Sequence, residues 1–257
     1  MIYKVVAMSG MTERIYPNET NTESRIQEQM TELLINRYEV ACRWLKEYLK
    51  DDNHRIIDIA CGSGYGTAML SGFGSIIGID IDKEAVEYAK KYYNKKNITF
   101  LVGNADDFTY LEKLGKFDAV VSSGTIEHVE DELAFLDWIR KSLNPNGVCI
   151  LGFPSTFTRD WAYPFHKRDI SPRKAVKMIN QAGFTILKEH FQTTRFRMKD
   201  LVYERDSNPS LPVPPLSHWF GYFLKRFDHL LRRVYQMSVG GGILFSDQQY
   251  LIKKTAE

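Results

Sequence analysis

The sequence predicts an α/β fold in which helices cover both faces of one seven-stranded, mostly parallel sheet. Short apolar segments rich in β-branched residues alternate with amphipathic segments of helical period, the pattern of a doubly wound sheet. A glycine-rich turn follows the first apolar segment, and an acidic residue ends the second. Ligands bind such sheets at the carboxyl ends of the strands, so both features predict a binding site at that edge.

Length and composition favour one domain with ordinary surface charge. A chain of 257 residues can form one α/β domain with insertions. The 34 basic and 32 acidic residues are mixed along the sequence, so no overall field favours a nucleic-acid partner. Three widely spaced cysteines favour reduced thiols. No segment approaches the roughly 18 apolar residues of a membrane span. We therefore expect a cytoplasmic protein without a transmembrane segment.

The expected elements follow from local periodicity. After a polar N-terminal segment, apolar residues recur at helical spacing and predict a helix over 22–50. A turn is expected at 144–147, where Asn, Pro and Gly gather before the fifth strand. Between these landmarks and beyond, we expect strands at 55–58, 75–79, 98–102, 117–122, 148–153 and 184–191, and helices at 67–71, 83–93, 131–143 and 171–182.

An insertion of different character follows the sixth strand. Residues 208–215 contain four prolines and cannot propagate a helix. Residues 216–237 predict an aromatic-rich amphipathic helix, which we expect to be a lid or the interface of a homodimer; a membrane-surface helix is the alternative. Leu244 and residues 250–252 mark a seventh strand. The predicted single domain, 1–257, thus comprises an N-terminal cap and helix (1–50), a core (51–192), the insertion (193–242) and a final strand (243–257).

The strongest functional signal is the stretch 55–67. Its buried strand ends in Asp58, and the glycines that follow allow bare backbone to approach a ligand. A dinucleotide fingerprint would need a third glycine at the position of Thr67, so an NAD enzyme is the weaker alternative. Asp80 ends the second strand, where its carboxylate could accept hydrogen bonds from both hydroxyls of a ribose.

The spacing of Asp58, Gly62 and Gly64 resembles motif I of the class I S-adenosylmethionine (SAM) methyltransferases, whose fold is Rossmann-like. From Glu13 to about Gln192 the chain is similar to the small-molecule members of that class. More narrowly, it resembles a subgroup found in bacterial surface-glycan biosynthesis, of capsule or lipopolysaccharide. The narrower resemblance rests on three places in the sequence. The first combines residues 13–17 with 37–38, the second is 125–128 and the third is 163–168. The proline-rich insertion is not covered by it.

The resemblance implies SAM as the cofactor and S-adenosylhomocysteine as its product. Where the family usually has Asp, this chain has Asn104, whose amide oxygen can still accept from the adenine amino group. Where the subgroup usually places an acid, this chain has Gly124, which removes a carboxylate role there. The implied cofactor-binding residues are Asp58, Ala60, Gly62, Gly64, Asp80, Ile81, Asn104, Ala105 and Ser122.

Two histidines are candidates for catalysis. A sugar hydroxyl has a high pKa, and histidine is the side chain that titrates near neutral pH, so it suits the role of general base. His128 follows the fourth strand and His166 lies in the loop after the fifth, although each could instead cap a helix or bond a buried carbonyl. The sequence leaves a metal undecided. The expected acceptor contacts are Arg14, Tyr16, Arg37, Tyr38, Tyr163, Lys167 and Arg168, the last two for a phosphate or carboxylate.

The leading hypothesis is therefore SAM-dependent O-methylation of a sugar or other small polar acceptor, nucleotide-linked or phosphorylated forms included, in surface-polysaccharide biosynthesis. A second hypothesis is methylation of a lipophilic phenol or lipid head group, for which the aromatic insertion helix would form the entrance. A third, of a different class, is a SAM-binding partner subunit without catalytic activity.

Overall fold

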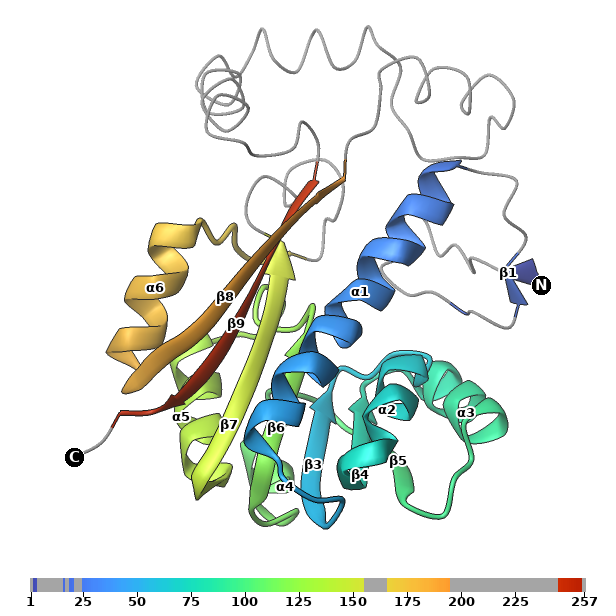
Figure 1. Ribbon diagram of the computed structural model, residues 1–257, viewed down its shortest axis with the longest axis horizontal. Coiled ribbons are helices and arrows are strands. Elements are labelled where there is room, and N and C mark those ends of the chain that lie inside the picture. Colours follow the sequence, from blue (N-terminus) through green and yellow to red (C-terminus); the bar gives the residue numbers. More distant parts are fainter. Residues whose placement is uncertain are drawn as a thin grey trace, which may run out of the picture.

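The computed structural model describes residues 2–3, 16, 19–20, 25–154, 166–194 and 245–255 of the chain (Figure 1). The predicted helix 216–237 lies outside the described residues, as do the predicted acceptor contacts Arg14 and Tyr163. Within the described residues no helix is long and apolar enough to cross a membrane.

One seven-stranded sheet organises the described chain, as predicted. Its order is β5-β4-β3-β6-β7-β9-β8; the first five strands in this order are parallel, and β9 is antiparallel to both of its neighbours. The chain leaves β3 in one direction to form β4 and β5, then returns to form β6 beside β3. The carboxyl ends of β3 and β6 are therefore the switch point where ligands bind in such sheets. The strands are β3 (His54–Ile59), β4 (Gly74–Asp80), β5 (Ile98–Val102), β6 (Phe117–Ser123), β7 (Leu143–Pro154), β8 (Phe184–Thr194) and β9 (Phe245–Lys254).

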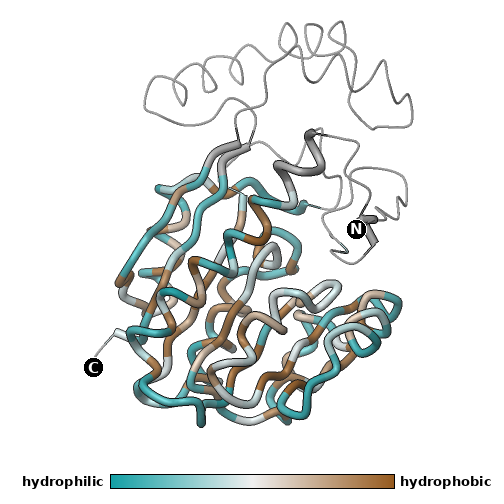
Figure 2. Tube along the Cα trace, turned by 45° about the vertical axis from the view of Figure 1, so that its right-hand side comes forward, coloured by the Kyte–Doolittle hydropathy of each residue, from teal (hydrophilic) through white to brown (hydrophobic). Residues whose placement is uncertain are grey.

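Helices cover both faces of this sheet, because successive side chains of each buried strand point to opposite sides. Ile56 packs with α1 and α2 on one face, whereas Ile57 packs with α4, α5 and α6 on the other. Figure 2 shows the hydrophobic residues gathered along the inner strands. The helices are α1 (Arg25–Tyr48), α2 (Tyr65–Leu70), the 3-10 helix η1 (Ser71–Phe73), α3 (Lys83–Tyr92), α4 (Phe108–Glu112), α5 (Glu132–Ser142) and α6 (Pro172–Gln181).

Short polar side chains fix where these helices begin. Asp82 accepts hydrogen bonds from the backbone at the start of α3, and Asp131 does the same for α5. Ser171 caps α6, whose first residue is Pro172. Capping of this kind satisfies backbone N–H groups that have no partner within the helix. It also orients the loops that precede the helices, and these loops carry most of the polar residues at the carboxyl edge.

Several element boundaries differ from those predicted. The helix α4, capped by Asp107, was not expected, because five residues are too few to display a helical period. The expected turn at 144–147 falls inside β7, where the pairing with β6 is irregular between Phe117 and Ala119. The last strand is longer than its predicted core. The two short strands β1 (Ile2–Tyr3) and β2 (Glu19–Thr20), which pair in parallel, were also not predicted.

Candidate active site

The turn after β3 depends on its glycines. Gly62 and Gly64 have φ of 55° and 85°. Ala60 has φ of 60°, a backbone angle that residues other than glycine rarely adopt. A Cβ at Gly64 would lie 2.6 Å from the Cβ of Ala89 and 2.9 Å from the Phe100 ring. Any side chain at Gly64 would therefore collide with α3 and β5. Gly64 thus lets the turn pack closely on α3 and β5, and the turn leaves its backbone groups at the carboxyl end of β3, where ligands bind such sheets.

Asp80 joins this turn to the end of β4. Its Oδ2 accepts from the backbone N–H of Gly62 at 2.8 Å, and its Oδ1 accepts from that of Asp82 at 2.9 Å. The side chain is 3% exposed. Each carboxylate oxygen has a second lone pair, so the predicted contact with ribose hydroxyls stays compatible with these bonds. The structure adds a role that the sequence did not predict, since Asp80 also holds the glycine turn in place.

Apolar side chains flank Asp80 at the same edge. Ile81 is 64% exposed and Val102, at the end of β5, is 45% exposed. Asn104 follows on the surface, where its Oδ1 accepts from the backbone N–H of Asp106 at 3.0 Å, and Ala105 is half-buried. This edge therefore offers apolar surface next to hydrogen-bonding groups, a combination suited to a purine ring. Val102 was missed because an apolar strand residue carries no sequence sign of exposure.

The carboxylate of Asp58 lies beneath the glycine turn and is fully buried. It accepts from the hydroxyl of Tyr38 at 3.0 Å and from that of Thr67 at 2.6 Å. Burial raises the pKa of Asp58 to about 7, against the lowering effect of these two hydrogen bonds. Asp58 thus ties α1 and α2 to the glycine turn, so we assign it to shaping the cofactor site.

Tyr38 corrects one of the expected acceptor contacts. It is 4% exposed, and burial followed by the Asp58 charge raises the pKa of its hydroxyl well above the usual value. Its ring also fills the space beside Gly66, where a Cβ would lie 2.1 Å from the Tyr38 Cζ. Because both its hydroxyl and its ring are engaged within the fold, Tyr38 supports the turn instead of meeting the acceptor.

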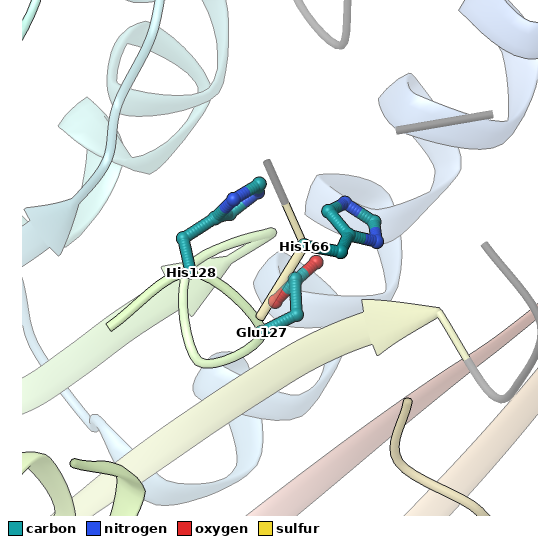
Figure 3. Close-up of side chains that lie close together, drawn as sticks. All are labelled: Glu127, His128 and His166. Atoms are coloured by element: carbon teal, nitrogen blue, oxygen red, sulfur yellow. The ribbon is translucent and has the colours of Figure 1, made fainter. Parts of the chain in front are cut away.

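Glu127, His128 and His166 lie together at the carboxyl end of β6 (Figure 3). One ligand atom from each lies within 4.8 Å of those of the other two. The two imidazole rings are edge to face, with centroids 4.6 Å apart. Glu127 and His166 are 3% and 2% exposed, whereas His128 is half-buried. We call these three residues the Glu-His-His cluster. It brings together the two histidines that were predicted to be catalytic, with a carboxylate that the prediction omitted.

The cluster is fixed by bonds between two loops that are distant in sequence. The backbone N–H of Lys167 donates to the carbonyl of Glu127 at 2.9 Å. On the side of the glycine turn, the Thr125 hydroxyl donates to the carbonyl of Ile59, the last residue of β3, at 3.2 Å. The cluster is therefore attached directly to the strand that leads into the glycine turn.

Arg168 corrects a second expectation. Its guanidinium donates to the carbonyls of Ile126 and Glu130, both at 2.8 Å, and its Nε lies 3.2 Å from the Glu132 carboxylate. These partners bracket Glu127 and His128, so Arg168 holds their loop instead of an acceptor phosphate. The neighbouring Lys167 forms an ion pair with Glu130, and its predicted acceptor contact stays a prediction.

Arg37 approaches the cluster from α1. Its guanidinium pairs with Asp247 of β9 through two short bonds, of 2.6 and 2.8 Å, and is 9% exposed. A Cβ at Gly124 would lie 3.5 Å from Arg37 Nη1 and 3.9 Å from Glu127 Oε1. The absence of a side chain at Gly124 therefore leaves room between the Arg37 guanidinium and the cluster. Asp247 was missed because its strand was assigned from its apolar residues.

The structure describes two further residues that were predicted to belong to the site. Ser122 is 2% exposed, and its hydroxyl has no hydrogen-bond partner among the described residues, a costly arrangement that a bound ligand could relieve. Tyr16 is half-buried and packs edge-on against Tyr88 of α3, with ring centroids 4.7 Å apart. Tyr16 thus lies on the α3 side of the molecule.

The sequence of this region matches a known family. Residues 57–151, from β3 to β7, match the model of the methyltransferase domain. A probable S-adenosylmethionine-dependent methyltransferase of Mycolicibacterium smegmatis is 27% identical over 137 residues, which are 51% of this chain and 52% of the relative. A ubiquinone biosynthesis O-methyltransferase of Bradyrhizobium diazoefficiens is 30% identical over 133 residues, or 48% of this chain and 49% of the relative. The chain thus spans about half the length of these relatives.

Solved structures extend the likeness to the whole fold. The YcgJ protein of Bacillus subtilis superposes with a TM-score of 0.60 at 16% identity, over 86% of this chain and 99% of that chain. A SAM-dependent methyltransferase of Geobacter sulfurreducens, solved with S-adenosyl-L-homocysteine, gives a TM-score of 0.54 at 13% identity, over 85% and 90% of the two chains. The bare glycine turn, the apolar edge at Ile81 and the Ser122 hydroxyl, which lacks a partner among the described residues, fit the cofactor of this class. Residues 57–151 therefore match a methyltransferase domain, and the described chain has the Rossmann-like sheet typical of class I SAM-dependent methyltransferases.

Proposed function

We propose that the protein transfers the methyl group of SAM to a hydroxyl oxygen of a small acceptor. The observation that carries this proposal is the Glu-His-His cluster, which is bonded through Thr125 to the end of β3, beside the glycine turn. When bound, SAM supplies a methyl group activated by a positively charged sulfur. The protein must then hold the acceptor in line with that methyl group and remove its proton.

The cofactor side of the site is assigned to the turn and the two strand ends beside it. Backbone groups of Ala60, Gly62 and Gly64 hold the amino-acid part of the cofactor, and Asp80 accepts from the ribose hydroxyls. Ile81 provides apolar contact for the adenine, whose amino group Asn104 and Ala105 recognise. The Ser122 hydroxyl turns toward the cofactor or acceptor, which would provide the hydrogen bond that it lacks among described residues.

The acceptor side is assigned to the cluster and Arg37. Methyl transfer from bound SAM would join the acceptor oxygen to the methyl carbon, with the electron pair of the C–S bond left on sulfur. The hydroxyl proton must leave, and the cluster can assist in two ways. His128, the more exposed imidazole, can accept the proton directly. Alternatively, the three side chains can hold a cation that lowers the pKa of a bound hydroxyl. The two mechanisms differ in their dependence on a cation.

For the acceptor we favour a sugar or another small polar molecule of surface-polysaccharide biosynthesis. The support is the resemblance of stretches 125–128 and 163–168 to that subgroup, together with the polar character of the buried side chains at this edge, Arg37, Glu127 and His166. A lipophilic phenol is the second candidate, because several relatives are named for ubiquinone biosynthesis. A homodimer through the insertion helix and a cytoplasmic location remain proposals as well.

The test begins with cofactor binding, measured by calorimetry. Asp80→Ala removes the ribose acceptor and releases the Gly62 N–H, and should weaken SAM binding by roughly 1.5–3 kcal/mol. Undiminished affinity in this variant would contradict the assignment of the cofactor site.

The acceptor is then sought by incubating the protein and methyl-labelled SAM with cell extracts, followed by mass spectrometry. Labelled sugars or sugar nucleotides would support the first candidate, and labelled phenolic lipids the second. Tight SAM binding without labelling of any extract would favour the third hypothesis, a partner subunit without catalysis.

A further inference from the structure

The Glu-His-His cluster has the donor composition of a transition-metal site. It offers two imidazole nitrogens and one carboxylate oxygen, all within 4.8 Å of one another. Within the part of the chain that the structure describes, it is the one group of three or more such side chains placed this closely. Two histidines and one carboxylate are also the ligands of catalytic zinc sites and of non-haem iron sites, which leave further positions open.

The geometry needs a small adjustment to enclose an ion. Zinc binds nitrogen and oxygen donors at about 2.0–2.2 Å, so the donors of a tetrahedral site lie about 3.3 Å apart. The cluster must therefore contract by up to about 1.5 Å. Glu127 and His166 are almost fully buried and provide a fixed pair of donors. His128 is half-buried and its ring lies edge to face against that of His166, so the closing movement is assigned to His128 (Figure 3).

The surroundings hold the backbone of these donors in place. The bond from the Lys167 N–H to the Glu127 carbonyl joins the two loops, and Arg168 binds the carbonyls on either side of the Glu127–His128 pair. Bonds that fix the backbone of a loop also restrict where its metal ligands lie. Each nearby cation has a carboxylate partner outside the cluster, namely Asp247 for Arg37, Glu130 for Lys167 and Glu132 for Arg168, although the Arg37 charge also acts on Glu127.

From this arrangement we infer that Glu127, His128 and His166 bind one divalent first-row transition ion, such as Zn²⁺ or Co²⁺. Imidazole donors favour these ions over Mg²⁺ and Ca²⁺, which prefer oxygen ligands. The catalytic role of this ion rests on the proposed methyl transfer. Held by Glu127, His128 and His166, the ion would lower the pKa of an acceptor hydroxyl at an open position. The hydroxyl proton would then leave to solvent, and the oxygen would bond the methyl carbon as the C–S electron pair stays on sulfur.

The metal site can be tested without any acceptor. The full-length protein, freed of metal with a chelator, is titrated with Zn²⁺ by calorimetry and with Co²⁺ by visible absorption. We expect one ion per chain. The variants Glu127→Gln and His166→Ala should bind at least about tenfold more weakly. His54→Ala is the matched control, because that imidazole also neighbours carboxylates, those of Asp51 and Asp118, but lies at the opposite end of β3.

Three results would overturn the inference. The first is an equal Zn²⁺ affinity in the wild type and in the Glu127→Gln and His166→Ala variants, which would show that the cluster does not bind the ion. Circular dichroism and SAM binding must show that these variants are folded. An effect of His54→Ala as large as theirs would mean that the binding is adventitious. Mg²⁺ binding as tight as Zn²⁺ binding would contradict the choice of ion.

Activity separates the metal inference from the proposed function. Once an acceptor is known, chelation should abolish methyl transfer and Zn²⁺ or Co²⁺ should restore it. Full turnover in the chelated protein would refute the catalytic part while leaving the proposed methyl transfer intact. If the cluster binds an ion tightly but the protein methylates no acceptor, the opposite follows. The metal site would be supported and the proposed function would be contradicted.

Discussion

The cofactor and acceptor sides of the candidate site are built from the chain in different ways. The cofactor side comes from consecutive turns at the ends of β3, β4 and β5. Its hydrogen bonds, such as that from Gly62 to Asp80, join residues that are close in the sequence. The acceptor side joins α1, the loop after β6, the segment before α6 and β9, as the Arg37–Asp247 pair and the Lys167–Glu127 bond illustrate. Local sequence therefore specifies the first, whereas the folded sheet brings the second together.

This difference leads to separate expectations for substitutions on the two sides. Changes in the glycine turn should alter both SAM affinity and stability, because the same backbone forms the site and packs against α3. Changes in the Glu-His-His cluster should lower turnover and leave SAM affinity nearly unchanged. The predictions below test whether the two sides can be separated in this way, beginning with the largest effect.

Gly64→Ala should destabilise the protein by about 2–4 kcal/mol and abolish SAM binding. The new Cβ would lie 2.6 Å from Ala89 on a backbone with φ of +85°, so steric overlap adds to conformational strain. Urea unfolding and calorimetry measure the two effects. Gly72→Ala is the matched control, since a Cβ at Gly72 meets nothing within 4 Å and should change stability by less than about 0.5 kcal/mol. Equal effects of the two substitutions would contradict the tight packing of the turn.

His128→Gln and His166→Gln should each lower kcat on the order of a hundredfold, with SAM affinity retained. Both roles considered for the cluster, proton acceptance and ion binding, need these imidazoles. Steady-state kinetics and SAM calorimetry on the same variants provide the comparison. A parallel loss of SAM affinity would show that the two sides of the site are not independent, and unchanged kcat in both variants would remove the cluster from catalysis.

How much the sequence predicted follows the same division. The seven strands, the glycine turn and the place of Asp80 at the end of a strand were predicted correctly, because β-branched runs, glycines and strand-end acids are local signals. The pairing of both histidines with Glu127 could not be predicted, since it depends on which loops the sheet order brings to one edge. The same holds for Tyr38 and Arg168, whose positions were predicted to be functional but whose partners, Asp58 and the Ile126 carbonyl, are visible only in the fold.

Asp58 offers a pH test of the cofactor side. Its folded-state pKa of about 7 exceeds that of an unfolded aspartate, about 3.9, so the folded protein retains a proton that the unfolded chain has released. Stability should therefore fall as pH rises from about 4 to about 7, by up to about 1.4 kcal/mol per pH unit from this group. Urea unfolding across that range measures the slope. The variant Asp58→Asn cannot titrate at this position, so its unfolding free energy should depend less on pH. An unaltered slope in that variant would mean that other groups cause the pH dependence.

Arg168→Met should give the smallest effect, a fall in kcat of about tenfold with KM and SAM affinity unchanged. Methionine keeps much of the apolar stem but removes the donors to the carbonyls of Ile126 and Glu130, so the loop carrying Glu127 and His128 loses its support. Lys167→Met is the neighbouring control: its side chain is 39% exposed and its pair with Glu130 contributes little at the surface, so kcat should stay the same. A rise in KM for Lys167→Met would support the predicted contact of that lysine with an acceptor phosphate or carboxylate. If Arg168→Met instead raised KM and left kcat intact, Arg168 would contact the acceptor after all, and the positioning role derived from its carbonyl partners would be wrong.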